Sequence, residues 1–317
     1  MPSLSNLKDF VSVPPWELRD WLLITEEEAT ELLSLAWAAT AAPAISAWDL
    51  AADNEAVVRP RPCPLPSLSL ALGAGGLSAA LVEVAGPPGV GKTQFCLHAA
   101  ALIAACGHDV FWIDTERTFS AQRVHEMLEV QLSASARPQE AAAQATQAMQ
   151  RIKHRACSSL QELHDFCSEL AGRALRGAPL PGLLVIDSVA AVARVDGSGD
   201  RRVQIPRRQA LLSSLASQLK VLVARPRQRR LQEPPGAISP GVVVTNQVMG
   251  DPSAGISRVT LGHVWHHSVN WRLVLSHLPP GSAGGPGSKE QADPFGRRYL
   301  FVEKSPCFKS MAVQQRP

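Results

Sequence analysis

Hydrophobic residues gather in short, nearly continuous runs, with segments of helical spacing between them. The runs cover residues 81–85, 110–114, 183–187 and 242–246. Unbroken apolar strands are typical of a parallel sheet that helices cover on both faces. Two later segments, residues 269–275 and 298–303, alternate apolar and polar positions as partly exposed strands do. The pattern predicts an α/β core with a mostly parallel central sheet.

The first part of the chain has a different pattern. Pro14-Pro15 precede Trp16, which fits the first turn of a helix over residues 15–22. Thr25 followed by Glu28 is a capping box and predicts a second helix. We therefore expect a small helical domain over residues 1–40, an Ala/Pro-rich linker over residues 41–66, and the core over residues 67–317.

Charge is distributed unevenly along the chain. The net charge is +3, but residues 1–58 carry −8, which leaves +11 on the remainder. A basic body fits a polyanionic partner, although a charged surface also serves solubility alone. The six cysteines form no CxxC pair, which is typical of reduced intracellular thiols. We find no signal segment or membrane-spanning run and expect no membrane association.

A phosphate-binding loop follows the first apolar run and opens a helix, which is the context such a loop requires. Its glycines let backbone N–H groups face phosphate oxygens, its lysine reaches the β- and γ-phosphates, and its threonine offers a hydroxyl to Mg²⁺. We expect ATP and Mg²⁺ as cofactors. The predicted loop comprises Gly86, Pro87, Pro88, Gly89, Val90, Gly91, Lys92 and Thr93.

Polar residues end three further apolar runs. Asp187 is the expected second Mg²⁺ contact, through water, although a carboxylate there also serves as a loop cap. Glu116 is placed to activate an attacking water, or is simply a surface acid. Gln247 is placed to sense the γ-phosphate and to pass that signal to the next loop.

These segments together resemble a known family. GPPGVGKTQFC, FWIDTERTFSAQRV, LLVIDSVAAVAR and VVVTNQV are similar to the RecA-type recombinases of eukaryotes and archaea. Leu261–Asn270 and Lys304-Ser305-Pro306 resemble in particular the B-type paralog, a homologous-recombination mediator. The resemblance implies a RecA-like P-loop ATPase core preceded by a small helical domain.

The resemblance also implies roles for individual residues. Glu116 and Lys92 would be catalytic, and Thr93 and Asp187 would hold Mg²⁺. Gln94 would contribute to the nucleotide site, Arg123 would pack against the adenine, and Gln247 would couple nucleotide to the second DNA loop. The expected activity is slow, DNA-stimulated hydrolysis of ATP in the nucleus, during repair of double-strand breaks. The expected partners are single-stranded and branched DNA and other recombinase paralogs, foremost the C-type paralog, in a hetero-oligomer.

A basic segment follows the third apolar run, where the family's first DNA loop lies. Clustered arginine beside glycine and proline fits contact with the phosphate backbone without base reading, although a solvated surface has the same composition. The candidate DNA-binding residues are Arg194, Arg201, Arg202, Arg207 and Arg208.

Trp48 in the linker is a candidate anchor for a neighbouring protomer, or else packs on its own domain. Three histidines, His263, His266 and His267, lack a cysteine or acidic companion at metal-ligand spacing, so we predict no metal there.

The chain departs from the family at several places. We expect it to lack the first helix and the last strand, to have a short second DNA loop over Met249–Thr260, and to carry a Pro-rich insertion over Ala224–Gly241. The short loop favours a mediator over the alternative of a strand-exchange recombinase. A second alternative is a scaffold that binds ATP without significant hydrolysis.

Overall fold

The computed structural model describes ten stretches of the chain, and it divides the chain into two compact units, Met1–Val57 and Val58–Pro317. Trp48 and residues 225–239 of the expected insertion lie outside the described part, as do residues 1–14, where the family's first helix was expected to be missing. The domain boundaries drawn above stay a prediction. The described stretches are residues 15–40, 77, 80–133, 137–176, 178–195, 201–224, 240–251, 256–277, 298–305 and 311–314.

The first unit contains two helices, α2 (Pro15–Leu22) and α3 (Glu26–Thr40). The capping box forms as predicted: the backbone N–H of Thr25 donates to Oε2 of Glu28 at 2.8 Å, and that of Glu28 donates to Oγ1 of Thr25 at 3.2 Å. Leu18 on α2 packs with Ala29 and Leu33 on α3. The apolar spacing thus produces a helical pair with a small core of its own.

A nine-stranded sheet forms the centre of the second unit, in the order β3-β2-β4-β5-β1-β7-β8-β9, with β6 paired to β5. Neighbours from β3 to β7 run parallel, whereas the β7–β8, β8–β9 and β5–β6 pairs are antiparallel. This confirms the predicted, mostly parallel α/β core. The strands are β1 (Leu81–Gly86), β2 (Val110–Asp114), β3 (Ile152–Ala156), β4 (Leu183–Asp187), β5 (Gly241–Asp251), β6 (Ile256–Val259), β7 (Trp271–Ser276), β8 (Tyr299–Lys304) and β9 (Met311–Gln314).

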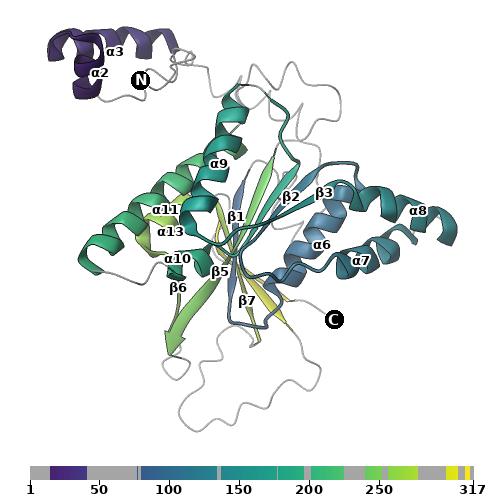
Figure 1. The fold of residues 1–317 in the computed structure, drawn as a ribbon. Coiled ribbons are helices and arrows are strands. Elements are labelled where there is room, and N and C mark those ends of the chain that lie inside the picture. The colour runs from purple at the N-terminus through teal and green to yellow at the C-terminus, as the bar shows by residue number, and fades with distance from the viewer. Residues whose placement is uncertain are drawn as a thin grey trace. The chain divides into compact units, whose positions relative to one another are not determined.

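Helices cover both faces of this sheet (Figure 1). One face carries α6 (Lys92–Ala105), α7 (Ala121–Ser133) and α8 (Pro138–Met149). The other face carries α9 (Leu160–Leu175), α10 (Val189–Val195), α11 (Arg201–Val223) and α13 (Gly262–Ser268). Helical connections between parallel strands must cross over one face of the sheet or the other, which produces this three-layer arrangement.

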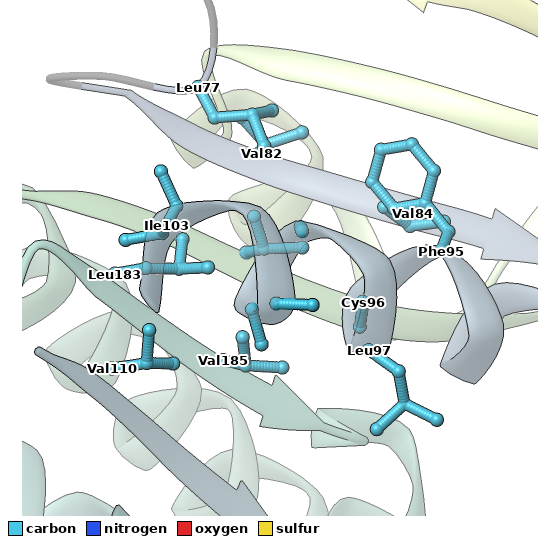
Figure 2. Close-up of a cluster of buried hydrophobic side chains, with 14 of the residues drawn as sticks. Leu77, Val82, Val84, Phe95, Cys96, Leu97, Ile103, Val110, Leu183 and Val185 are labelled. Atoms are coloured by element: carbon cyan, nitrogen blue, oxygen red, sulfur yellow. The ribbon is translucent and has the colours of Figure 1, made fainter. Parts of the chain in front are cut away.

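Successive side chains along a strand point to opposite faces of the sheet, so they contribute to two hydrophobic cores, one on each face. Val82 and Val84 of β1 pack with Phe95 and Ile103 of α6 on one side, as Figure 2 shows. Leu81 of β1 faces the other core, with α9, α10 and α11. Both faces of the central strands are therefore buried, which is why their sequences are continuous apolar runs.

The structure corrects three expectations. Residues 152–156 form the edge strand β3, which sequence reasoning missed because its middle residues are polar and exposed. A strand, β9, follows Lys304-Ser305-Pro306, so the expectation of no further strand is wrong. The basic segment expected to be a loop is helical from Arg201 onward, as the start of α11. Among the described helices, none is long and apolar enough to cross a membrane.

Candidate nucleotide-binding site

The phosphate loop connects the end of β1 to the start of α6. Gly86 must be glycine because a Cβ there would lie 2.6 Å from the carbonyl oxygen of Leu275 and 2.9 Å from a methyl of Val90. Gly91 adopts a φ of 106° at the N-cap of α6, a conformation that favours glycine. Without a capping side chain, the first N–H groups of α6 stay available to an anion, which the helix dipole also favours.

Lys92 lies folded into this loop. Its Nζ donates to the carbonyl oxygens of Gly86 and Pro87, both at 2.9 Å. Burial lowers the pKa of the amine, while the carboxylates of Asp187 and Glu116 oppose that shift. The ammonium group is thus held at the mouth of the loop, where a bound phosphate could replace the two carbonyl contacts.

Asp187 ends β4 and contacts the loop directly. Oγ1 of Thr93 donates to Oδ2 of Asp187 at 2.7 Å, and Oγ1 of Thr245 donates to Oδ1. Burial raises the pKa of Asp187, and the hydrogen bonds from Thr245 and Thr93 oppose that shift. A hydroxyl beside a carboxylate is the hard oxygen donor set that Mg²⁺ prefers, so these residues fit a magnesium ion.

Glu116 sits on a turn just after β2. Asp114, which is 3% exposed, accepts hydrogen bonds from the backbone N–H groups of Glu116 at 3.2 Å, Thr118 at 3.1 Å and Phe119 at 3.0 Å. Oγ of Ser188 donates to Oε1 of Glu116. The turn therefore brings the predicted catalytic carboxylate beside the end of β4, next to Asp187.

Gln94 and Arg123 lie together on the outer side of the loop. Nε of Arg123 donates to Oε1 of Gln94 at 3.4 Å, and Nη1 forms a 2.8 Å ion pair with Glu126. Both side chains are exposed. The structure thus joins two residues that the sequence assigned separately to the nucleotide.

Gln247 lies on β5 directly beside the phosphate loop, because it is the register partner of Gly86 in the β1–β5 pair. Its Oε1 accepts a hydrogen bond from Nη1 of Arg194, at the end of α10. A residue predicted to sense nucleotide is therefore in contact with a residue predicted to bind DNA.

The remaining predicted DNA-binding residues lie in the amino-terminal part of α11. Arg207 is exposed on this helix, and Arg208 is half-buried beside it. Arg201 and Arg202 belong to the first turn of α11, and their side chains lie outside the described part of the structure.

Sequence reasoning missed the residues that hold the site together. Asp114 accepts a hydrogen bond from the backbone N–H of Glu116, and the hydroxyls of Thr118 and Thr245 both donate to Asp187. Of the three, Asp114 carried a signal in the sequence, since it is a polar residue at the end of an apolar strand. Thr115 links β2 to β4, since its N–H donates to the carbonyl of Asp187 at 2.8 Å.

Comparison with known proteins identifies the fold around this site. The Rad51 family model matches residues 66–278. The chain belongs to the Rad51 family. This match contains the phosphate loop, the ends of β2 and β4, and the β5–β6 hairpin.

Individual family members are similar over most of the chain. DNA repair protein RAD51 homolog 2 of Homo sapiens is 27% identical, over 94% of this chain and 78% of that protein. DNA repair protein RAD51 homolog 4 of Bos taurus is 31% identical, over 68% of this chain and 60% of that protein. DNA repair and recombination protein RadB of Halobacterium salinarum is 28% identical, over 73% of this chain and 86% of that protein. Members of the family are DNA-dependent ATPases.

Proposed function

We propose that this member of the Rad51 family is a recombinase paralog of homologous recombination. It acts in the nucleus in the repair of DNA double-strand breaks and assists the main recombinase filament within a complex of paralogs. Its similarity to RAD51 homologs 2 and 4 supports this proposal. The C-type paralog is the expected partner, and single-stranded and branched DNA are the expected nucleic acids.

The observation that carries the ATPase proposal is the 2.7 Å contact between Thr93 and Asp187 beside the Lys92 ammonium group. The loop residues Gly86–Thr93 would bind the phosphates, and Thr93 and Asp187 would hold the magnesium ion. Magnesium, when bound, supplies positive charge to the phosphate oxygens. Glu116 would orient and deprotonate the attacking water, since it lies at the same edge of the sheet.

The outer residues complete the proposed site. Gln94 and Arg123 would contact the adenine side of the nucleotide, and Gln247 would sense the terminal phosphate. The DNA backbone would be contacted through charge rather than base identity by five arginines, Arg194, Arg201, Arg202, Arg207 and Arg208. Trp48 remains a proposed anchor for a neighbouring protomer.

The first experiment measures phosphate release by the full chain and by Lys92→Ala, with and without single-stranded DNA. We expect Lys92→Ala to lose about 100-fold or more of the DNA-stimulated rate, because charge stabilisation at the transferring phosphate dominates catalysis. Lys153→Ala is the matched control, since this exposed lysine on β3 contacts only the nearby carbonyl of Gln150 among the contacts described for it. Equal rates for native protein and Lys92→Ala would leave the ATP-binding scaffold as the better description.

A second experiment distinguishes a mediator from a strand-exchange recombinase. We expect no joint molecules when the full chain alone is incubated with single-stranded DNA and a homologous duplex. A pull-down from nuclear extract followed by mass spectrometry should recover other recombinase paralogs. Joint molecules formed by this protein alone, or the absence of paralogs from the pull-down, would contradict the mediator role.

A further inference from the structure

Glu83 is a buried carboxylate in the middle of β1, the strand that leads into the phosphate loop, and its exposure is 0%. Its Oε1 accepts hydrogen bonds from Nδ2 of Asn246 at 2.6 Å and from Nε1 of Trp265 at 2.9 Å. Its Oε2 accepts one from Nε of Arg272 at 2.5 Å. One carboxylate thus joins β1 to β5, α13 and β7. We call Glu83, Asn246, Trp265 and Arg272 the Glu83 cluster.

Two residues from segments that the nucleotide site does not use connect to this cluster. They are His266, from Leu261–Asn270, and Lys304, from Lys304-Ser305-Pro306. Nδ1 of His266 on α13 contacts Nη1 of Arg272. Nζ of Lys304, at the end of β8, donates to the carbonyl oxygens of His266 at 2.9 Å and His267 at 3.1 Å. Lys304 therefore caps the carboxyl end of α13, where the helix dipole favours a cation. The two residues fix α13 in position above β1 and β7.

A buried ion pair is a poor source of stability, because desolvation offsets much of its Coulomb energy. An apolar set of the same volume would fill the space at similar or lower free energy. What the Glu83 cluster does specify is geometry, since its three donors come from three different elements, β5, α13 and β7, and tie each of them to β1.

Asn246 carries this geometry to the β5–β6 hairpin. Its Nδ2 also donates to the carbonyl oxygen of Thr260 at 3.1 Å. Its Oδ1 accepts from the N–H of Gln247 at 2.7 Å and from Oγ1 of Thr260 at 2.5 Å. Thr260 N–H in turn donates to the carbonyl oxygen of Gln247 at 3.2 Å. Asn246 and Thr260 thus close the base of the hairpin, whose strands pair from Val248 with Val259 outward.

Gln247 is held between two sites by this closure. On one side it is the register partner of Gly86 in the phosphate loop. On the other side its Oε1 accepts the Arg194 hydrogen bond. Its backbone is fixed at both the N–H and the carbonyl by Asn246 and Thr260. A change in the hairpin base would therefore move Gln247 relative to the phosphate loop.

We propose that Asn246 and Thr260 form a clamp, anchored on the Glu83 cluster, that couples nucleotide at the phosphate loop to DNA affinity. This inference rests on the proposed function, and it assigns a role to residues outside the nucleotide site. Asn246, Thr260 and Glu83 are positioning residues, acting through Gln247 and the hairpin. Without the clamp, nucleotide and DNA would each still bind, but neither would strengthen the other.

The test compares Thr260→Val and Thr260→Ala, which lack the hydroxyl, with Thr260→Ser, which keeps it. The measured quantity is the ratio of the single-stranded DNA dissociation constants of the full chain without and with a non-hydrolysable ATP analogue. Thr146→Val is the matched control, because the Thr146 hydroxyl also donates to a carbonyl, that of Ala142, but on the exposed helix α8. Thermal unfolding verifies that each variant is folded.

We expect a wild-type ratio of about 5–150, the usual range of allosteric coupling. Thr260→Val and Thr260→Ala should bring the ratio close to one and leave the affinity for the analogue alone within about twofold. Thr260→Ser and Thr146→Val should keep the wild-type ratio. A wild-type ratio retained by Thr260→Val and Thr260→Ala overturns the clamp.

Amide hydrogen exchange separates this outcome from a failure of the proposed function. In the absence of DNA and nucleotide, the N–H groups of Gln247 and Thr260 should exchange faster in Thr260→Val than in the wild type or Thr260→Ser. Unchanged exchange overturns the clamp by itself. The other outcome is a coupling ratio of one in the wild-type protein together with the expected change in exchange. This result would contradict the proposed function, and the coupling role of the clamp with it.

Discussion

At the scale of single residues, Asp114 determines where the proposed catalytic carboxylate lies. It accepts three backbone hydrogen bonds within the Glu116–Phe119 turn, and Nε2 of His154 lies 3.2 Å from its Oδ2. Burial raises the pKa of Asp114, but the hydrogen bonds from Phe119, Thr118 and His154 outweigh burial and hold it below its ordinary value. Asp114 is therefore ionised at neutral pH, and its stabilising contribution is lost only as the pH falls through that depressed pKa.

Asp114→Asn should slow DNA-stimulated phosphate release by about tenfold while leaving KM for ATP nearly unchanged, because the turn loosens but the phosphate loop does not. An amide has one acceptor oxygen where the carboxylate has two, so it cannot hold all three N–H groups. Steady-state kinetics measure both constants. Asp165→Asn is the control, since Asp165 is exposed and contacts His164 and Gln161. A raised KM with unchanged kcat would contradict a positioning role for Asp114.

At the scale of elements, α3 illustrates how local sequence determines a helix start. The reciprocal Thr25–Glu28 bonds satisfy N–H groups that the helix itself leaves unpaired. Hydrogen bonds from Thr25 lower the pKa of Glu28, so this side chain is ionised at neutral pH. Its negative charge interacts favourably with the positive end of the helix dipole. The edge strand β3 is the opposite case, because its pairing with β2 rather than its polar sequence makes it a strand.

Thr25→Ala should destabilise the start of α3 by about 1 kcal/mol, because the cap is lost. Amides in the first turn of α3 should then exchange about fivefold faster in the full chain. Thr30→Ala is the control within the same helix: the Thr30 hydroxyl donates to the carbonyl of Glu26, which already lies inside the helix. Alanine is the better helix former there, so exchange should be unchanged or slower. Equal acceleration by both substitutions would argue against the capping box.

At the scale of the second unit, the parallel sheet brings the ends of β1, β2, β4 and β5 to one edge. The registers place Asp114 opposite Asp187 and Gly86 opposite Gln247. Phosphate loop, carboxylates and amide therefore meet at this edge, although one or more helices separate them along the chain. The Glu83–Arg272 pair lies deeper in the same sheet, where its exposure is 0% and 1%.

Arg272→Met should lower the free energy of unfolding by about 3–5 kcal/mol, because it leaves the Glu83 carboxylate buried without its ionic partner. Urea unfolding followed by circular dichroism measures the change. Arg151→Met is the matched control: its 3.7 Å pair with Asp109 has side-chain exposures of 37% and 62%. Such an exposed pair contributes about 0–1 kcal/mol. Similar losses in the two variants would show that the buried pair carries no special energetic weight.

Some elements of the fold were predictable from the sequence and others were not. The apolar runs of β1, β2, β4 and β5 were predictable because both of their faces are buried. The phosphate loop was predictable because a glycine-rich loop between strand and helix has one well-understood chemistry. β3 and β9 were not predictable, because an edge strand forms by pairing with its one neighbouring strand rather than from its own sequence pattern. The helical start of α11 was missed because Pro206 and the arginines resemble a loop.

The amino-acid sequence by itself therefore determined the α/β class, the loop residues Gly86–Thr93 and the polar residues at the strand ends. These depend on local patterns: apolar period, glycine placement and a polar residue after a strand. Only the tertiary structure decided that Thr93 meets Asp187, that Gln247 meets Arg194, and that Glu83 joins three distant elements. Such contacts depend on strand order and register, which are set by the packing of the whole sheet and are not contained in any one segment.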